Sequence, residues 1–141
     1  MNFKQVSGSV SAAKGFSASG VHCGIRKNKT KKDLALIVSE TRANAACTFT
    51  TNKVKAAPLK RNMCSVADGY AQAIIVNSGI ANSCTADGDE TAEGMAMICA
   101  EALGISPDDV IVGSTGVIGV SLPLEPIRNA MDSLVENLDE K

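Results

Sequence analysis

Alternating hydrophobic and polar positions in the first third of the chain predict three β-strands. Residues 15–25 alternate in part and are interrupted by glycine, which is typical of a bent strand. Residues 33–40 and 45–52 predict two further strands, and residues 41–44 predict the turn between them. These strands indicate an antiparallel β-meander, in which a basic segment joins the first strand to the second.

The pattern then changes to helices that alternate with short apolar strands. A short helix is expected around Pro58, over residues 54–63, because proline is tolerated in the first turn of a helix. Residues 73–76 predict an apolar strand that breaks at residues 77–79 into a loop rich in Asn, Ser, Thr, Asp and Gly. Apolar residues at helical spacing, with acidic residues in the first turn, predict a helix over residues 89–103.

The last third predicts a second strand–loop–helix unit. Gly104 is expected to cap the preceding helix, and residues 107–109 form a turn before a short strand over residues 110–112. That strand is expected to end in the Gly-Ser-Thr-Gly loop of residues 113–116. Residues 123–140 predict an amphipathic helix with one apolar stripe.

These elements predict an α+β protein, with a β-meander followed by strand-loop-helix units. The strands present more faces than three modest helices can cover, so the layered architecture is expected to be incomplete. A chain of 141 residues is one domain or a piece of one, and residues 1–141 are taken as a single unit.

Composition excludes several classes of function. Aromatic residues make up 3% of the chain, there is no Trp, and the net charge is -1, all of which disfavour nucleic-acid binding. The five cysteines are odd in number and form no CxxC pair, which indicates a reduced, cytoplasmic protein without a metal site. His22 and Cys23 are adjacent on a predicted strand and point to opposite faces, so neither a metal site nor a Cys–His dyad is expected from them. No apolar run reaches the length of a membrane span.

Charge is concentrated in one segment, residues 25–32, where five of eight residues are Arg or Lys. Two interpretations remain open. The segment is either an anion-binding patch or, as we favour, the solvated tip of a hairpin between two strands.

The loop of residues 113–116 places two hydroxyls between two glycines, a composition typical of three kinds of site. A P-loop is disfavoured because residues 113–119 contain no lysine. A nucleophile elbow requires a different glycine spacing, and the chain offers only His22 as a base for Ser114 or Thr115. Two interpretations therefore remain, an oxyanion hole and an ordinary glycine-rich turn.

Four segments resemble one known family in order and spacing. They are KGFSASGVHCGIRKNKTKKDLALIVSE, CTFTTNKVKAAPLK, AIIVNSGIANSCT and VGSTGVIGVSLPLEPI, and they extend from about Lys14 to Ile127. Together they resemble the amino-terminal part of the ornithine acetyltransferase / glutamate N-acetyltransferase family of arginine biosynthesis.

The resemblance implies a fold like the αββα sandwich of amino-terminal-nucleophile hydrolases, here incomplete. It implies a precursor that cleaves itself at an Ala–Thr bond, so that the new amino-terminal Thr of a second chain is the nucleophile. That Thr takes acetyl from N-acetylornithine, or from acetyl-CoA in bifunctional members, and passes it to glutamate. Thr115 and Gly116 match the residues of the family's oxyanion hole. The complete enzyme is expected to be a cytoplasmic hetero-oligomer without a metal or a resident cofactor, with acetyl-CoA as a possible co-substrate.

The sequence departs from the family pattern in two places. No K-G-x-G-M or A-T-M-L stretch is present before Lys141, so the chain is expected to be an amino-terminal fragment that is inactive alone. Ile80 stands where the family has Asn, and the CTADGDE segment is altered, so residues 77–85 either line the site or form a structural turn. The alternative function is an inactive truncated remnant that acts as a binding or regulatory module. A third, weaker interpretation is the peptidase side of the same broad fold.

Overall fold

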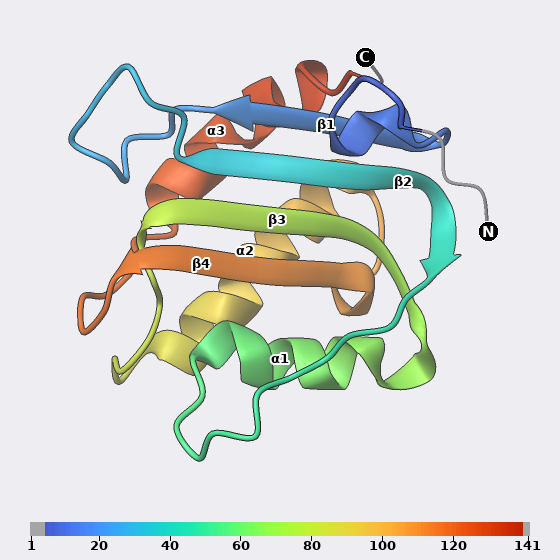
Figure 1. Ribbon diagram of the computed structural model, residues 1–141. Helices are drawn as coiled ribbons and strands as arrows, with labels where there is room; N and C mark the ends of the chain where they lie inside the picture. Colours follow the sequence, from blue (N-terminus) through green and yellow to red (C-terminus); the bar gives the residue numbers. More distant parts are fainter. Residues whose placement is uncertain (1–4, 140–141) are drawn as a thin grey trace.

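A mixed sheet and three helices dominate the fold in the computed structural model, which describes residues 5–139 (Figure 1). The strands are β1 (Phe16–Val21), β2 (Leu34–Asn44), β3 (Tyr70–Ile80) and β4 (Val110–Val117). The helices are α1 (Ala57–Ser65), α2 (Gly88–Leu103) and α3 (Glu125–Glu136). No helix in residues 5–139 is both long and apolar enough to cross a membrane.

The sheet follows the order of the chain, β1-β2-β3-β4. β1 pairs with β2 and β2 with β3 in antiparallel fashion, whereas β3 and β4 are parallel. A parallel pair needs a long crossover connection, and α2 provides it. The predicted meander is therefore present, followed by one strand–helix–strand unit.

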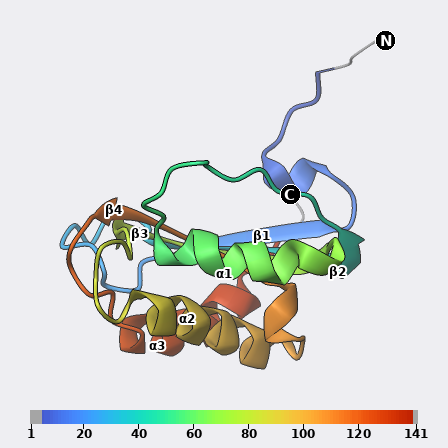
Figure 2. The ribbon, with the colours of Figure 1, turned by 90° about the horizontal axis from the view of Figure 1, so that it is seen from below.

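One face of the sheet is buried by α2 and α3, which lie side by side beneath it in Figure 2. Alternate strand residues point to this face, as strand geometry requires. The residues that form this core on the strands are Leu34, Leu36, Ala73, Ile75, Val110 and Val112. They pack against buried residues of the two helices, including Met95, Ala96, Cys99, Ile127, Met131 and Leu134.

Helix α1 lies along the free edge of β4 and satisfies its backbone. The Asn62 side chain donates to the Val112 carbonyl over 2.8 Å and accepts from the Val112 N–H over 3.0 Å. Arg61 is nearly buried and donates to the carbonyls of Val110 and Pro107, each over 2.6 Å. These bonds occupy edge groups that would otherwise be open to another strand.

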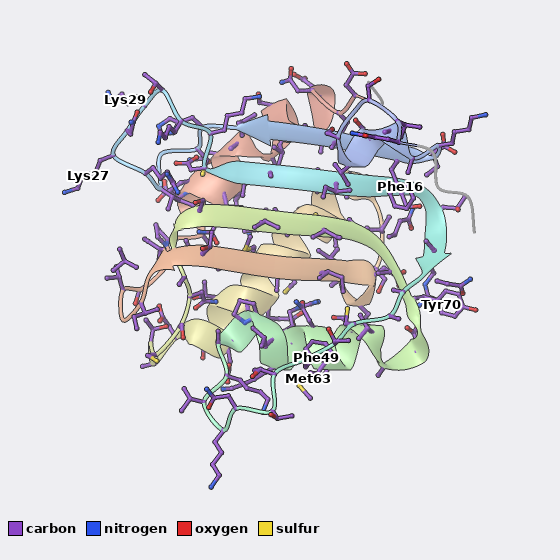
Figure 3. All side chains as sticks on the ribbon, viewed as in Figure 1. Phe16, Lys27, Lys29, Phe49, Met63 and Tyr70 are labelled. Atoms are coloured by element: carbon purple, nitrogen blue, oxygen red, sulfur yellow. The ribbon has the colours of Figure 1, made fainter. Side chains whose placement is uncertain are left out.

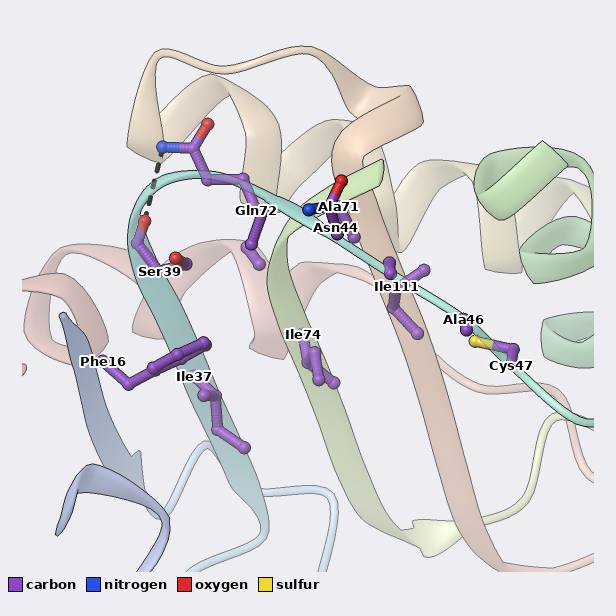
Figure 4. A pocket seen from close by; sticks show the side chains of 13 residues that line it. Phe16, Ile37, Ser39, Asn44, Ala46, Cys47, Ala71, Gln72, Ile74 and Ile111 are labelled. Atoms are coloured by element: carbon purple, nitrogen blue, oxygen red, sulfur yellow. Dashed lines mark hydrogen bonds between the residues drawn. The ribbon is translucent and has the colours of Figure 1, made fainter. Parts of the chain in front are cut away.

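The opposite face of the sheet is apolar and only partly covered. Ile37, Ile74 and Ile111 lie on it, and Ile74 is 38% exposed. Phe16 and the segment after β2 border a hollow of about 290 Å³ on this face (Figure 4). The fold is thus α+β with helices on one face of the sheet, as the sequence predicts for an incomplete sandwich.

Several predicted helix boundaries are close to the structure. The helix around Pro58, the helix ended by Gly104 and the last amphipathic helix are all present. Gly104 adopts the left-handed conformation with φ 66° and donates to the Ala100 carbonyl. The last helix ends at Glu136 rather than at residue 140, which lies outside the described residues, as do residues 1–4 and 141 of the single predicted unit.

The predicted strand over residues 45–52 is wrong, because this segment has no regular secondary structure. The predicted turn at residues 41–44 is also wrong, since β2 continues to Asn44 across a register shift between Val38 and Ala43. A strand needs a hydrogen-bonding partner, and both edges of β2 are already occupied by β1 and β3. The segment after Asn44 therefore has no edge of β2 to join.

Candidate oxyanion site at the ends of the parallel strands

Residues 77–79 and residues 113–116, which the sequence predicts to be loops after strands, form the ends of the strands themselves. β3 continues through Asn77, Ser78 and Gly79, and β4 continues through residues 113–116, so neither strand breaks where the sequence predicts. The parallel register aligns them as Asn77 with Ser114, Ser78 with Thr115, Gly79 with Gly116 and Ile80 with Val117. Both motifs thus meet at the carboxyl ends of two parallel strands, where α/β sheets commonly bind ligands.

The two hydroxyls of this segment lie in different surroundings. Ser114 shares the alternation of Val110 and Val112, and its Oγ is buried without a hydrogen-bond partner among residues 5–139. Thr115 is exposed and belongs to the opposite face of β4, which the helices do not cover. A reacting group that approaches from the open face reaches Thr115 and not Ser114.

Gly116 occupies a position that admits no side chain. Its φ is +137°, and a Cβ atom there would lie 2.2 Å from the carbonyl carbon and 2.3 Å from the oxygen of Gly79. Gly79 has φ +123°, and a Cβ atom on it would lie 3.0 Å from Ile25 Cγ2. The paired glycines bring two backbones close together and leave the surface beside Thr115 open.

Buried amides fix the loop that follows β3. Asn77 is fully buried, and its Nδ2 donates to the Ile80 carbonyl over 2.9 Å. Asn82 is buried with φ 43°, and its Nδ2 donates to the Gly88 carbonyl over 3.0 Å. The Ala81 N–H also donates to the Val117 carbonyl over 2.8 Å, so the loop is tied to the end of β4.

Asp33 holds the basic loop against the same strand ends. Its buried carboxylate accepts from the backbone N–H groups of Cys23 and Arg26, over 2.6 and 2.7 Å. Its carbonyl accepts from the Ser78 N–H over 2.8 Å. Burial alone would raise the pKa of Asp33, but the Arg26 and Cys23 N–H groups bind the ionised form and hold this pKa below its ordinary value of 3.8.

Arg26 connects the basic loop to the candidate site. Its Nη2 donates to the Ser78 Oγ over 2.5 Å, and Ser78 is the register neighbour of Thr115. The Nε of Arg26 is buried and has no partner among residues 5–139. A cleft of about 830 Å³ lies here, lined by Ile25, Arg26, Lys27, Asn28, Gly79, Ile80, Gly116, Val117 and Val120.

His22 and Cys23, the base and nucleophile candidates of the basic hairpin, contact Asp33 and the backbone of their own hairpin. The Nδ1 of His22 is 3.0 Å from the Lys31 carbonyl and 3.2 Å from Asp33 Oδ2. Burial raises the pKa of Cys23 to about 11, so this thiol is protonated at neutral pH. Residues 5–139 contain no cluster of His, Cys, Asp and Glu able to hold a metal ion. The site therefore offers hydrogen-bond donors and an open surface rather than a nucleophile with its base.

The sequence predicts Thr115 and Gly116 as site residues, and it gives no signal for Asp33 and Arg26, which the structure places beside them. The sequence predicts a strand that begins at the polar residue Asp33, but the hydrophobic pattern does not indicate that the carboxylate of Asp33 is buried. The basic segment lies in the hairpin connection that the sequence favours, because residues 22–33 join β1 to β2. Its contact with β3 is a tertiary feature that charge alone does not reveal.

Comparisons with known proteins identify related sequences and structures. A sequence model described as the ArgJ family matches residues 17–141. The arginine biosynthesis bifunctional protein ArgJ of Caldanaerobacter subterraneus subsp. tengcongensis is 49% identical over 135 residues, which cover 95% of this chain and 33% of that protein. The protein of the same name from Gloeobacter violaceus is 50% identical over 141 residues, which cover 99% of this chain and 34% of that protein. The chain thus spans about a third of the length of these curated relatives.

Two solved structures share the fold. The crystal structure of arginine biosynthesis bifunctional protein ArgJ from Bacillus halodurans matches with a TM-score of 0.88 and 46% identity, over 95% of this chain and 69% of that chain. The structure of ornithine acetyltransferase complexed with ornithine from Mycobacterium tuberculosis matches with a TM-score of 0.87 and 34% identity, over 94% of this chain and 72% of that chain.

Proposed function

The chain belongs to the ArgJ family, and from this premise we propose that it is the amino-terminal part of an acetyltransferase of arginine biosynthesis. The complete enzyme moves an acetyl group from N-acetylornithine, or from acetyl-CoA, to glutamate. This chain supplies the oxyanion hole through Thr115 and Gly116. A second chain supplies the nucleophilic amino-terminal Thr, and the two form a hetero-oligomer without a resident cofactor.

The observation that carries the proposal is the geometry at the end of β4. Thr115 is exposed on the open face of the sheet, directly before a glycine at which a Cβ atom would lie 2.2 Å from the neighbouring backbone. A hydroxyl and a backbone N–H at such a place can donate to one oxygen. Each donor of this kind typically contributes about 3–4 kcal/mol to transition-state stabilisation.

The proposed reaction runs in two steps that use the same donors. The Thr hydroxyl oxygen of the second chain bonds to the acetyl carbon, the bond from that carbon to the ornithine nitrogen breaks, and the hydroxyl proton passes to the leaving amine. The glutamate amine then attacks the acetyl ester, the ester bond breaks, and the proton of the amine returns to the Thr oxygen. Each step passes through a tetrahedral oxyanion, which Thr115 and Gly116 would stabilise.

Two further features support the setting of this proposal. The open apolar surface around Ile37, Ile74 and Ile111 leaves room for a second protein layer on the face of the sheet to which Thr115 belongs. All five cysteines are free thiols, which suits the reducing cytoplasm that we propose as the location.

A chimera tests the function directly. The 141-residue chain replaces the matching third of the Caldanaerobacter relative, to which it is 49% identical. We expect acetyl transfer from N-acetylornithine to glutamate by the chimera and none by the 141-residue chain alone. Absence of transfer by a folded, processed chimera would favour the alternative of an inactive binding or regulatory module. Transfer by the isolated chain would show a nucleophile within it.

A further inference from the structure

Ser78 places a second hydroxyl on the open face of the sheet, beside Thr115. Asn77 is buried under the helices, so strand alternation turns the next side chain, that of Ser78, to the opposite face. Thr115 lies on the same face of β4 and is the register partner of Ser78. Ser78 also lines a hollow of about 220 Å³ together with Ala35 and Val76, so a group outside the sheet can reach it.

Arg26 fixes the direction of the hydrogen bond at Ser78. Its Nη2 donates to Ser78 Oγ over 2.5 Å. A guanidinium can only donate, so the oxygen of Ser78 is the acceptor and the hydroxyl proton stays free for another acceptor. Within residues 5–139, Arg26 is the only hydrogen-bond partner of this hydroxyl. The open face therefore has one hydroxyl proton available next to Thr115.

The surroundings of Arg26 direct its charge to Ser78. Figure 3 shows Lys27 and Lys29 extending from the tip of the same loop into solvent, whereas Arg26 bonds a residue of β3. The buried carboxylate of Asp33 accepts the backbone N–H of Arg26 over 2.7 Å and so fixes its place in the loop. The guanidinium of Arg26 forms no ion pair within residues 5–139. Its positive charge therefore polarises the hydroxyl of Ser78 and makes it a stronger donor.

We propose that Ser78 is a third hydrogen-bond donor to the oxyanion, in addition to Thr115 and Gly116, and that Arg26 is the positioning residue that orients and polarises it. The inference rests on the proposed function and adds a catalytic residue to the same site. Neighbouring strands lie about 4.8 Å apart. An oxygen atom between the hydroxyls of Ser78 and Thr115 can therefore accept from both at ordinary hydrogen-bond lengths. The bond from Ser78 strengthens as negative charge develops on that oxygen.

Steady-state kinetics of the active chimera test this assignment. Ser78→Ala should lower kcat by roughly tenfold to hundredfold with little change in KM, because the donor acts on the transition state. Ser78→Thr keeps the hydroxyl and should retain most of kcat. Arg26→Gln should lower kcat by roughly tenfold, since a neutral donor replaces a charged one, and Arg26→Lys should recover part of that loss. Arg128→Gln removes a charge from an exposed ion pair on α3 and is the control, with kcat expected to be unchanged.

Two further measurements separate this role from a purely structural one. If Arg26 acts through Ser78, Arg26→Gln should have little further effect on kcat once Ser78 is already alanine. The second measurement is the infrared stretch of the acetyl-enzyme carbonyl, isotopically labelled at its carbon and prepared without glutamate. This stretch should move to higher frequency in Ser78→Ala, because the carbonyl loses a donor that polarises it. A Ser78 hydroxyl that only ties the loop to β3 would leave the frequency unchanged.

The outcomes distinguish this inference from the proposed function. Full turnover and an unshifted carbonyl band in a folded, processed Ser78→Ala chimera would overturn the inference. Independent losses that multiply in the double variant, or a raised KM with kcat unchanged, would also overturn it, because Arg26 would then act without Ser78 or bind substrate directly. Absence of acetyl transfer by the parent chimera would contradict the proposed function instead. Self-cleavage, which also forms an oxyanion, tests Ser78 in that case: Ser78→Ala should be processed more slowly than the parent on gels, and equal rates would overturn the inference.

Discussion

At the scale of single residues, the neighbouring hydroxyls of Ser114 and Thr115 are separated by the alternation of β4. Ser114 Oγ is buried on the helix-covered side, whereas Thr115 is exposed on the open side. The sequence resemblance points to Thr115, and strand geometry gives a physical reason why its neighbour is unsuitable. The choice between the two residues can therefore be tested by parallel substitutions.

Thr115→Ala in the chimera should lower kcat by roughly 10² to 10³, with a much smaller change in KM, if its hydroxyl donates only to the oxyanion. Both half-reactions should slow, because both pass through the same charge. Ser114→Ala is the matched control and should have a mild effect on kcat. Self-cleavage is followed on gels before the kinetics, since it also forms an oxyanion. If a processed Thr115→Ala enzyme keeps its turnover and the Ser114→Ala enzyme is inactive, the assignment of the oxyanion donor to Thr115 is wrong, and the hydroxyl of Ser114 is the one that matters.

Gly116→Ala should impair the site for a different reason. The new Cβ would lie 2.2 Å from the Gly79 carbonyl carbon, so the ends of β3 and β4 must separate. We expect loss of kcat at least as large as for Thr115→Ala, together with a lower melting temperature, which Thr115→Ala should not show. Gly119→Ala is the control, since it also has positive φ, of +74°, but no atom within 4 Å of its Cβ position. Equal melting temperatures for the two alanine variants would contradict this account of the close approach.

At the scale of elements, the sequence predicts helices better than strand ends. The helix capped by Gly104 and the last amphipathic helix have local signals, namely spacing, caps and acidic first turns. The extensions of β3 to Ile80 and of β4 to Val117 have none, because each strand end is stabilised by the other. In the sequence, runs of polar residues and glycine predict loops. In the structure, the parallel pairing of β3 and β4 supplies the hydrogen bonds that keep these residues extended. The site lies in this unpredicted part, so its motif was recognisable while its geometry was not.

The hairpin between β1 and β2 depends on Asp33, and this dependence should vary with pH. The folded pKa of Asp33 lies below its ordinary value of 3.8, so its ionised form stabilises the fold. This stabilisation is complete above about pH 5 and is lost as pH falls through the folded pKa. Asp33→Asn should cost about 2–3 kcal/mol near neutral pH, because two backbone N–H groups lose a buried carboxylate.

The measurement is the urea midpoint of the assembled chimera at several pH values. The difference between the parent and Asp33→Asn should be fully present above about pH 5 and should shrink as pH falls through the folded pKa of Asp33. The pKa of Asp68 is also lowered, chiefly by its hydrogen bond from Arg42. Asp68 therefore loses stabilising charge in acid too, but it does so equally in the parent and in Asp33→Asn, so its contribution cancels in the difference between them. A difference that is independent of pH would show that the charge of Asp33 does not hold the loop.

At the scale of the whole molecule, the two faces of the sheet are unequal. One face is closed by α2 and α3, and the other leaves Ile37, Ile74 and Ile111 around a hollow of about 290 Å³ (Figure 4). Thr115 belongs to the same face, so a protein layer that covers the whole face, from the hollow to the end of β4, also encloses the proposed oxyanion hole. Assembly and catalysis should therefore be linked through one surface.

The isolated 141-residue chain should bind a dye specific for exposed apolar surface, or aggregate, because this face lacks a covering layer. Ile74→Lys should reduce both effects, since Ile74 is 38% exposed at the centre of the face. The control is Met97→Lys, which alters a side chain that is 55% exposed on α2, on the covered side of the sheet. Dye fluorescence and light scattering measure the isolated chains, and co-purification with a tagged remainder of the Caldanaerobacter relative measures assembly. Ile74→Lys should abolish that co-purification while Met97→Lys retains it, because a buried lysine without a partner is costly in an interface. If Ile74→Lys assembles normally and is fully active, the open face is not where the rest of the enzyme packs, and the oxyanion hole must be enclosed from another side.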